Sequence, residues 1–150
     1  MNEKIKKIPA VVLGLSANGL SVARSLGRKG IPVIGLDDAD KAPAKFSRYV
    51  KKYIHAPHVE NGIELLRILL SISQSFSDKP VLLATADEYV AFVSDYRMQL
   101  SDYFRFLLPL KQTVDDFLDK QKTADFCIKK KIPHPQTYFL ESGRPWENII

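Results

Sequence analysis

Short apolar runs alternate with a segment of helical period in the first forty residues, and this alternation constrains the fold most. Ile8 to Leu13 is apolar and closed by Gly14, as expected of a buried strand in a parallel sheet. Asn18 to Lys29 has apolar residues at helical spacing and ends at Gly30, which suits a left-handed helix cap. Ile31 to Leu36 is a second apolar run. The order predicts a strand–helix–strand unit with a right-handed crossover.

The same alternation continues along the chain and predicts an α/β fold. Further strands are expected at Val50 to His55, Pro80 to Ala84 and Phe104 to Leu107, with helices at Gly62 to Phe76 and Ala86 to Leu100. Asp38 to Arg48 is expected to form a polar loop. Strands that alternate with helices favour a three-layer, doubly wound parallel sheet, for which we expect the strand order 3-2-1-4-5.

The last third of the chain has a different pattern. Val114 to Lys131 is predicted to form one helix or two, and Pro133 and Pro135 stop it because neither can continue a helical ladder. Gln136 to Leu140 is a candidate for one more strand. We therefore divide the chain into a first domain of residues 1–112 and a segment of residues 113–150 that begins with a linker helix.

Composition sets the class of protein and its surroundings. The chain has 150 residues, 45% of them hydrophobic, which is enough for one domain with a packed core. Cys127 is the only cysteine, so no disulfide is predicted and a reducing, cytoplasmic location is expected. No signal peptide or membrane span is predicted. The net charge of +5 comes from scattered basic clusters, which need no nucleic-acid partner to explain them.

The first candidate site is the loop from Gly14 to Gly19, between the first strand and the first helix. It offers Gly14, Ser16, Asn18 and Gly19 to a ligand, because glycines allow close approach and a helix N-terminus attracts anions. A dinucleotide fingerprint has glycine where this loop has Ser16, although Asp37 lies 23 residues beyond Gly14, near the usual ribose-binding acid. A purely structural turn, a small ligand and NAD or FAD all remain open.

The second candidate site follows the fourth expected strand. Thr85, Asp87 and Glu88 lie there, where ligands bind at the carboxyl ends of parallel strands. Thr85 also suits a helix N-cap, and the two acidic residues suit the positive end of a helix, so a structural role is equally open. The histidines lack the spacing of metal ligands, and no complete catalytic set is visible. We predict no metal site and no catalytic residue in this chain.

Two stretches resemble a known family. Phe117 to Thr137, with its Asp119-Lys120 pair, amphipathic helix and Pro133 turn, is similar to the opening of the ATP-grasp domain in the group that includes biotin carboxylase and carbamoyl phosphate synthetase. The upstream part resembles the Rossmann-like pre-ATP-grasp domain of predicted ATP-grasp carboligases. That likeness lies in Val11 to Gly35, Ser47-Arg48-Tyr49 and Thr85 to Glu88.

The resemblance implies the N-terminal, substrate-cleft domain of a ligase that joins a small-molecule carboxylate to an amine or related nucleophile through an acylphosphate. It assigns Lys120 to the nucleotide phosphates and both candidate loops to the acceptor cleft. The full-length enzyme would use ATP and Mg²⁺, with the other ATP ligands in a C-terminal lobe beyond Ile150. The isolated chain is then expected to be inactive and to hold no cofactor tightly.

Two other functions remain open. The chain could be a stand-alone nucleotide- or NAD(P)-binding Rossmann module with a redox or sensing role. It could also be a scaffold that forms a homodimer.

Overall fold

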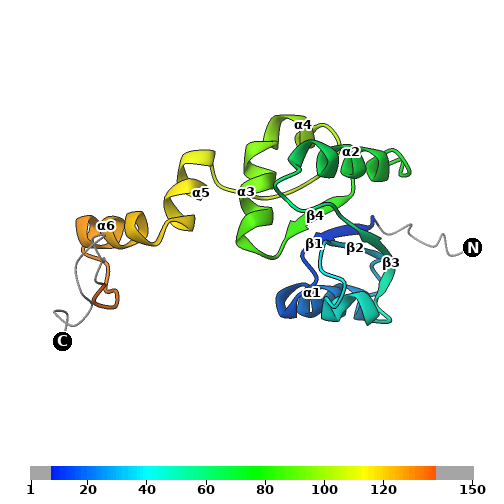
Figure 1. The fold of residues 1–150 in the computed structure, drawn as a ribbon, viewed down its shortest axis with the longest axis horizontal. Coiled ribbons are helices and arrows are strands. Elements are labelled where there is room, and N and C mark those ends of the chain that lie inside the picture. The colour runs from blue at the N-terminus through cyan, green and yellow to red at the C-terminus, as the bar shows by residue number, and fades with distance from the viewer. Residues whose placement is uncertain (1–7, 138–150) are drawn as a thin grey trace, which may run out of the picture. The chain divides into compact units, whose positions relative to one another are not determined.

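The computed structural model describes residues 8–137 (Figure 1). Its elements are β1 (Ala10–Leu13), α1 (Ala17–Arg28), β2 (Val33–Asp37), the 3₁₀ helix η1 (Pro43–Phe46), β3 (Val50–His55), α2 (Gly62–Ser73), β4 (Val81–Ala84), α3 (Asp87–Asp95), α4 (Arg97–Ser101), α5 (Lys111–Leu118) and α6 (Lys120–Lys130). The strand expected at Gln136 to Leu140 lies partly outside the described residues, and Gln136 and Thr137 have no regular structure. No helix in the described part is long and apolar enough to cross a membrane.

The four strands form one parallel sheet in the order β3-β2-β1-β4, which confirms the first four places of the expected order. The prediction of a fifth strand at Phe104 to Leu107 was wrong. The segment after α4 forms a single parallel bridge, in which the Leu82 N–H donates to the Arg105 carbonyl and the Arg105 N–H donates to the Pro80 carbonyl, both at 2.9 Å. Pro109 follows closely and has no N–H with which to extend a ladder.

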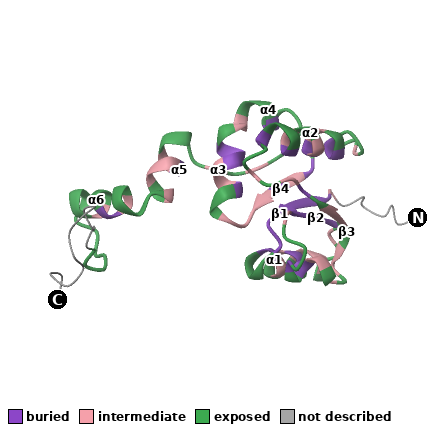
Figure 2. Cartoon of the chain, in the orientation of Figure 1, coloured by how far each residue is buried: buried purple, intermediate pink, exposed green. Residues whose placement is uncertain are grey.

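The sheet is the middle of three layers, as the sequence predicts. Figure 1 shows α1 on one side of the sheet and α2, α3 and α4 on the other. Val11 and Leu13 of β1 point to the helices α2 to α4, and Val12 points to the α1 side, because successive side chains of a strand face opposite ways. The strands β1 and β2 are buried along their whole length (Figure 2).

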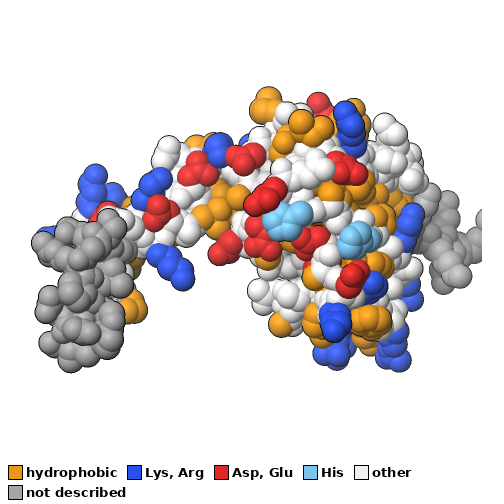
Figure 3. Space-filling model, in the orientation of Figure 1, with side chains coloured by type: hydrophobic (Ala, Val, Ile, Leu, Met, Phe, Trp, Pro, Cys, Tyr) orange, Lys and Arg blue, Asp and Glu red, His pale blue; other side chains and the backbone are white. Residues whose placement is uncertain are grey.

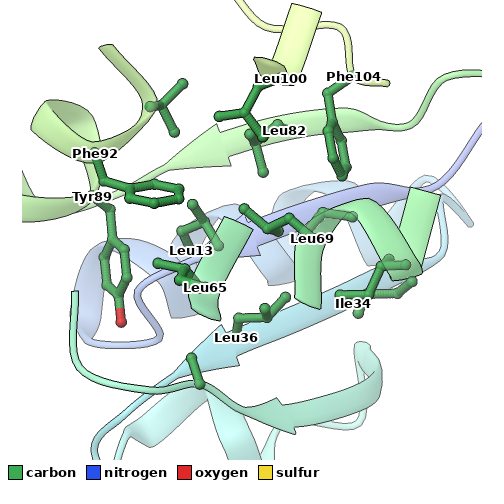
Figure 4. Close-up of a cluster of buried hydrophobic side chains, with 14 residues drawn as sticks. Leu13, Ile34, Leu36, Leu65, Leu69, Leu82, Tyr89, Phe92, Leu100 and Phe104 are labelled. Atoms are coloured by element: carbon green, nitrogen blue, oxygen red, sulfur yellow. The ribbon is translucent and has the colours of Figure 1, made fainter. Parts of the chain in front are cut away.

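The larger core lies between the sheet and helices α2, α3 and α4. Its side chains come from every layer it joins, including Leu13, Leu36, Leu65, Leu69, Phe92 and Leu100 (Figure 4). The smaller core lies under α1 and η1 and contains Leu15, Ala23 and Ala44. Two apolar cores on opposite faces pack against the sheet, and the loops at its carboxyl edge start from this packed framework.

The end of α1 follows the local chemistry of the sequence, whereas the length of the helix after β4 does not. Gly30 has φ 71° and ends α1, with the Gly30 N–H donating to Gly27 and the Ile31 N–H to Leu26, as predicted from the glycine. The single helix expected over Ala86 to Leu100 is instead interrupted at Tyr96, which separates α3 from α4.

The chain divides into two compact units between Pro109 and Leu110. Within the second unit, α5 and α6 pack through Phe117 and Phe126, whose rings meet edge to face at 5.4 Å. Asp119 separates the helices and caps α6, since its Oδ1 accepts the N–H groups of Gln121 and Lys122 at 2.8 and 3.2 Å. That the second unit opens an ATP-grasp domain stays a prediction.

Candidate ligand site at the carboxyl edge of the sheet

A cavity of about 380 Å³ lies where the loops after β1, β2 and β4 meet. These loops converge because the strands are parallel and their carboxyl ends share one edge of the sheet. The polar residues that line the cavity are Ser16, Asp37, Asp38, Lys41, Glu88 and Tyr89. The fold therefore brings both candidate loops of the sequence together at a single hollow.

The predicted site residues fall into three groups. Gly14, Ser16, Asp37 and Glu88 line the cavity. Asn18, Gly19, Thr85 and Asp87 lie in the same loops and helix ends but do not line it. Lys120 belongs to the second unit, so it is described separately below.

Three of the predicted residues hold the β1–α1 loop against the β4–α3 loop. The hydroxyl of Thr85 donates to the carbonyl of Gly14 at 2.8 Å or of Leu13 at 3.0 Å, and the Asn18 amide donates to the Thr85 carbonyl at 3.3 Å. Gly19 has no room for a side chain, because a Cβ there would lie 2.0 Å from the Gly14 oxygen. Their observed contacts are structural, which is one of the interpretations that the sequence left open for these loops.

The prediction that Thr85 caps the following helix was wrong. Ala86 occupies the N-cap position of α3, and no side chain accepts a hydrogen bond from the first turn. The Thr85 hydroxyl is engaged by the end of β1 instead. Asp87 and Glu88 lie in the first turn of α3, where their negative charge favours the positive end of the helix.

Asp37 is buried, with 6% of its surface exposed, and both carboxylate oxygens are used. Oδ2 accepts the N–H of Leu15, and Oδ1 accepts the N–H of Ala39 at 2.7 Å. The Asp37 carbonyl accepts the N–H of Ala56 at 3.0 Å and the hydroxyl of Tyr53 at 3.2 Å. Asp37 thus ties the end of β2 to the loop after β1 and shapes one wall of the cavity.

Tyr89 is a cavity residue that the sequence analysis missed. Its side chain comes from α3 and is only 3% exposed, yet it lines the cavity. Figure 4 shows its hydroxyl at the far end of the ring from the helix that carries it. Burial raises the pKa of the Tyr89 phenol, and the charges of Asp38 and Asp37 raise it further, so the group stays protonated. An isolated tyrosine in an amphipathic helix is indistinguishable in sequence from an ordinary core residue.

Asp38 and Lys41 were also missed as site residues. Asp38 follows Asp37 directly and lies in the loop after β2, where its carboxylate is 3.7 Å from Nε2 of His58. Figure 3 shows acidic side chains gathered around histidines on this face of the first unit. The signal available in the sequence was the Asp37-Asp38 pair at the end of a strand, of which only the first member was selected.

Lys120 is exposed and begins α6. Its Nζ makes no hydrogen bond or ion pair with any residue among 8–137, and a cation at a helix N-terminus gains nothing from the helix dipole. In the same part of the chain, no three His, Cys, Asp or Glu side chains are placed to hold a metal ion.

Comparison with known proteins gives one similar sequence and several similar folds. No protein-family model matches the chain. It is 22% identical to D-aspartate ligase of Enterococcus faecium (strain Aus0004) over 134 residues, which cover 87% of this chain and 32% of the ligase. The chain thus spans about a third of the length of this curated relative.

The similar structures include a ligase and a synthetase. L-amino acid ligase from Bacillus licheniformis matches with a TM-score of 0.64 and 12% identity over 86% of this chain and 30% of that one. N5-carboxyaminoimidazole synthetase from Staphylococcus aureus complexed with ADP matches with a TM-score of 0.58 and 14% identity over 81% and 30%.

A third similar structure is the biotin carboxylase domain of a single-chain bacterial carboxylase. It matches with a TM-score of 0.54 and 17% identity over 83% of this chain and 30% of that one. The predicted resemblance to the N-terminal domain of ATP-grasp ligases is confirmed in the fold.

Proposed function

We propose that this chain is the N-terminal, acceptor-side domain of an ATP-dependent ligase that joins a carboxylate to an amine through an acylphosphate. The observation that carries the proposal is the fold, which resembles that of ligases about three times as long. The open cavity that the loops form at the carboxyl edge of the sheet agrees with it. The D-aspartate and L-amino acid ligases among the similar proteins support an amine-bearing acceptor.

Each part of the site has a role in this proposal. The N-terminus of α1, with the exposed Ser16, presents hydrogen-bond donors to the bound molecule. Asp37 positions that loop through the Leu15 N–H and is not itself a catalytic residue. Lys120 would contact the nucleotide phosphates as a mobile point charge. Because the reaction consumes ATP, we also propose a cytoplasmic location.

The proposed reaction has two steps. A carboxylate oxygen attacks the γ-phosphorus of ATP, the bond to the bridging oxygen breaks and ADP leaves, which gives an acylphosphate. The lone pair of an amine nitrogen then attacks the acyl carbon, phosphate leaves and the nitrogen loses a proton. When bound, Mg²⁺ neutralises phosphate charge in such transfers. We propose that the ligands of this ion lie in the C-terminal lobe that the resemblance implies; among residues 8–137, no three His, Cys, Asp or Glu side chains are placed to hold a metal ion.

The test is an assay for ADP and amide product on the protein encoded by the complete reading frame that contains this chain. We expect ADP release that depends on both an amino acid and a carboxylate, with product formed in equal amount, and none from residues 1–150 alone. A reading frame without a nucleotide-binding lobe would contradict the proposal. Thermal stabilisation of the chain by NAD(P), with none of the full protein by ATP, would favour a Rossmann module with a redox or sensing role instead.

A further inference from the structure

We infer that Arg97 is a positioning residue, which holds the exit segment of the first unit and so orders the backbone that leads into the second unit during the reaction. The exit segment is Phe104 to Pro109, between α4 and the unit boundary. That Arg97 holds this segment follows from contacts within the first unit. Its part in the reaction rests on the proposed function, which places the acceptor in the first unit and the nucleotide at Lys120 of the second.

The exit segment packs on the first unit, but sheet pairing holds little of it. Phe104 is buried and Phe106 and Leu108 pack against the larger core, whereas Leu107 is 97% exposed. Such alternation is typical of an extended strand. The backbone nevertheless pairs with β4 only at Arg105, and Pro109 has no N–H to donate. Sheet pairing therefore does not hold residues 106–109 in place.

Arg97 makes the contacts that do hold these residues. Its guanidinium nitrogen Nη2 donates to the carbonyls of Leu108, at 3.2 Å, and of Pro109. Its Cζ lies 5.8 Å from the centre of the Phe106 ring, within the range of a cation–π contact. From within residues 8–137, no other hydrogen bond reaches the backbone of residues 106–109. One side chain thus holds the last residues before the unit boundary.

The interruption at Tyr96 gives Arg97 a packed base. Tyr96 is the C-cap of α3 and the N-cap of α4, and Arg97 follows it as the first residue of α4. The Tyr96 ring centre lies 4.9 Å from that of Phe92, and a Cβ at Gly62 would lie 2.8 Å from the Tyr96 hydroxyl. Tyr96 is therefore packed against α3 and the start of α2. The side chain of Arg97 extends from this packed part of the first unit.

The guanidinium of Arg97 also carries a cost. Its Nε is buried and has no hydrogen-bond partner among the described residues. A buried donor without a partner destabilises the fold, and this cost offsets the gain from the two Nη2 bonds. We therefore expect Arg97 to contribute little to the stability of the first unit and much to the order of the exit segment. This contrast distinguishes a positioning residue from an ordinary stabilising contact.

The exit segment connects the two parts that the proposed reaction needs. The carboxyl-edge cavity belongs to the first unit, and Lys120 belongs to the second. Groups held by different units react faster when the connection between the units is ordered, because less orientational freedom is lost in the transition state. Loosening residues 106–109 should therefore lower kcat and leave each KM nearly unchanged, since neither binding site is altered.

The first test measures the order of the exit segment in this chain by ¹⁵N relaxation, together with the Tm of the first unit. In the parent chain we expect order parameters of about 0.85 at Leu107 and Leu108. Arg97→Met keeps an apolar stem and removes the donors, so it should lower both values below about 0.6. The Tm should shift by less than about 4 °C. Parent-like order parameters in Arg97→Met, with or without a lower Tm, would overturn the inference.

Two further variants serve as controls. Arg105→Met makes the same substitution at an exposed arginine of the exit segment, which pairs with β4 through its backbone, and should leave the order parameters unchanged. Arg97→Lys keeps the positive charge but has one nitrogen and no planar fork, so it should restore the order only in part. If Arg105→Met loosens the segment as much as Arg97→Met does, Arg97 is not what holds it.

The second test measures kcat and both KM values in the protein encoded by the complete reading frame. Arg97→Met should lower kcat for ligation about tenfold, with each KM changed by less than about twofold, and Arg105→Met should match the parent. Parent-like kcat in Arg97→Met would reject the positioning role. If the parent protein performs no ligation, the proposed function fails, and the order parameters alone then decide whether Arg97 holds the exit segment.

Discussion

The buried carboxylate of Asp37, at the end of β2, accepts the backbone N–H of Leu15, in the loop that follows β1. Its second oxygen accepts the N–H of Ala39, two residues further along its own loop. One side chain thus fixes two of the three loops that form the cavity. An acidic residue at this place can therefore be required for shape, whether or not it contacts a ligand.

Replacing Asp37 with Asn should destabilise the first unit. The amide would place an NH₂ donor opposite one of two backbone donors, so a buried N–H would lose its partner. We expect a loss of about 1–3 kcal/mol in the free energy of unfolding, measured by urea denaturation. Asp40→Asn is the control, because Asp40 is exposed and should change stability by less than about 0.5 kcal/mol. Equal stability of the two variants would show that the Asp37 contacts contribute little.

Gly19→Ala should also destabilise the first unit, although alanine is the better helix former. A Cβ at position 19 would lie 2.0 Å from the Gly14 oxygen, so α1 must shift away from the end of β1. We expect a cost of about 2 kcal/mol or more, against a propensity gain of about 1 kcal/mol. Ser21→Ala, at an exposed position of the same helix, should be neutral or slightly stabilising. A stabilised Gly19→Ala variant would show that the helix approaches the strand less closely.

Asp119→Ala should loosen the start of α6. The N-cap carboxylate accepts the N–H groups of Gln121 and Lys122, and its loss should cost about 1 kcal/mol of helix stability. Faster hydrogen exchange at these two amides is the expected readout. Asp119→Asn keeps an accepting oxygen and should behave like the parent chain, and Asp125→Ala is the control within the helix. Unchanged hydrogen exchange at these two amides in Asp119→Ala would show that Asp119 does not stabilise the start of α6.

Tyr49 should ionise below the usual pH range of a tyrosine. Hydrogen bonds from Arg48, at 3.0 Å, and then from Arg28 stabilise the phenolate and lower the pKa of Tyr49. The difference in alkaline ultraviolet titration between the parent chain and Tyr49→Phe isolates this one group. Arg48→Gln should raise the midpoint, and Arg24→Gln should leave it unchanged. A midpoint that is insensitive to Arg48 would contradict the assignment.

The arrangement of the sheet could be predicted because its signals are local and repeated. Apolar runs closed by polar or glycine residues placed β1 to β4, and Gly30 marked the end of α1. The prediction of a fifth strand failed because a short apolar run does not show whether its backbone pairs with a neighbouring strand beyond one bridge. The interruption at Tyr96 was not predicted for a related reason, since the helical period of the sequence continues through this residue.

The site was predicted at the level of loops and only in part at the level of residues. Parallel topology alone brings the loops after β1, β2 and β4 together, so Ser16 and Glu88 could be placed. The structural roles of Thr85 and Asp37 could not be predicted, because they depend on hydrogen bonds between loops that are distant in sequence. Tyr89 could not be found, because its pattern is that of a core residue.

The most direct test of the account is a comparison of two KM values in the protein encoded by the complete reading frame. Ser16→Trp should fill the cavity and raise the KM for the amine acceptor about tenfold, with the KM for ATP nearly unchanged. Lys120→Ala should raise the KM for ATP about tenfold and leave the KM for the amine acceptor nearly unchanged. If Ser16→Trp leaves the acceptor KM unchanged, or if both variants alter the two KM values equally, the carboxyl-edge cavity is not the acceptor site.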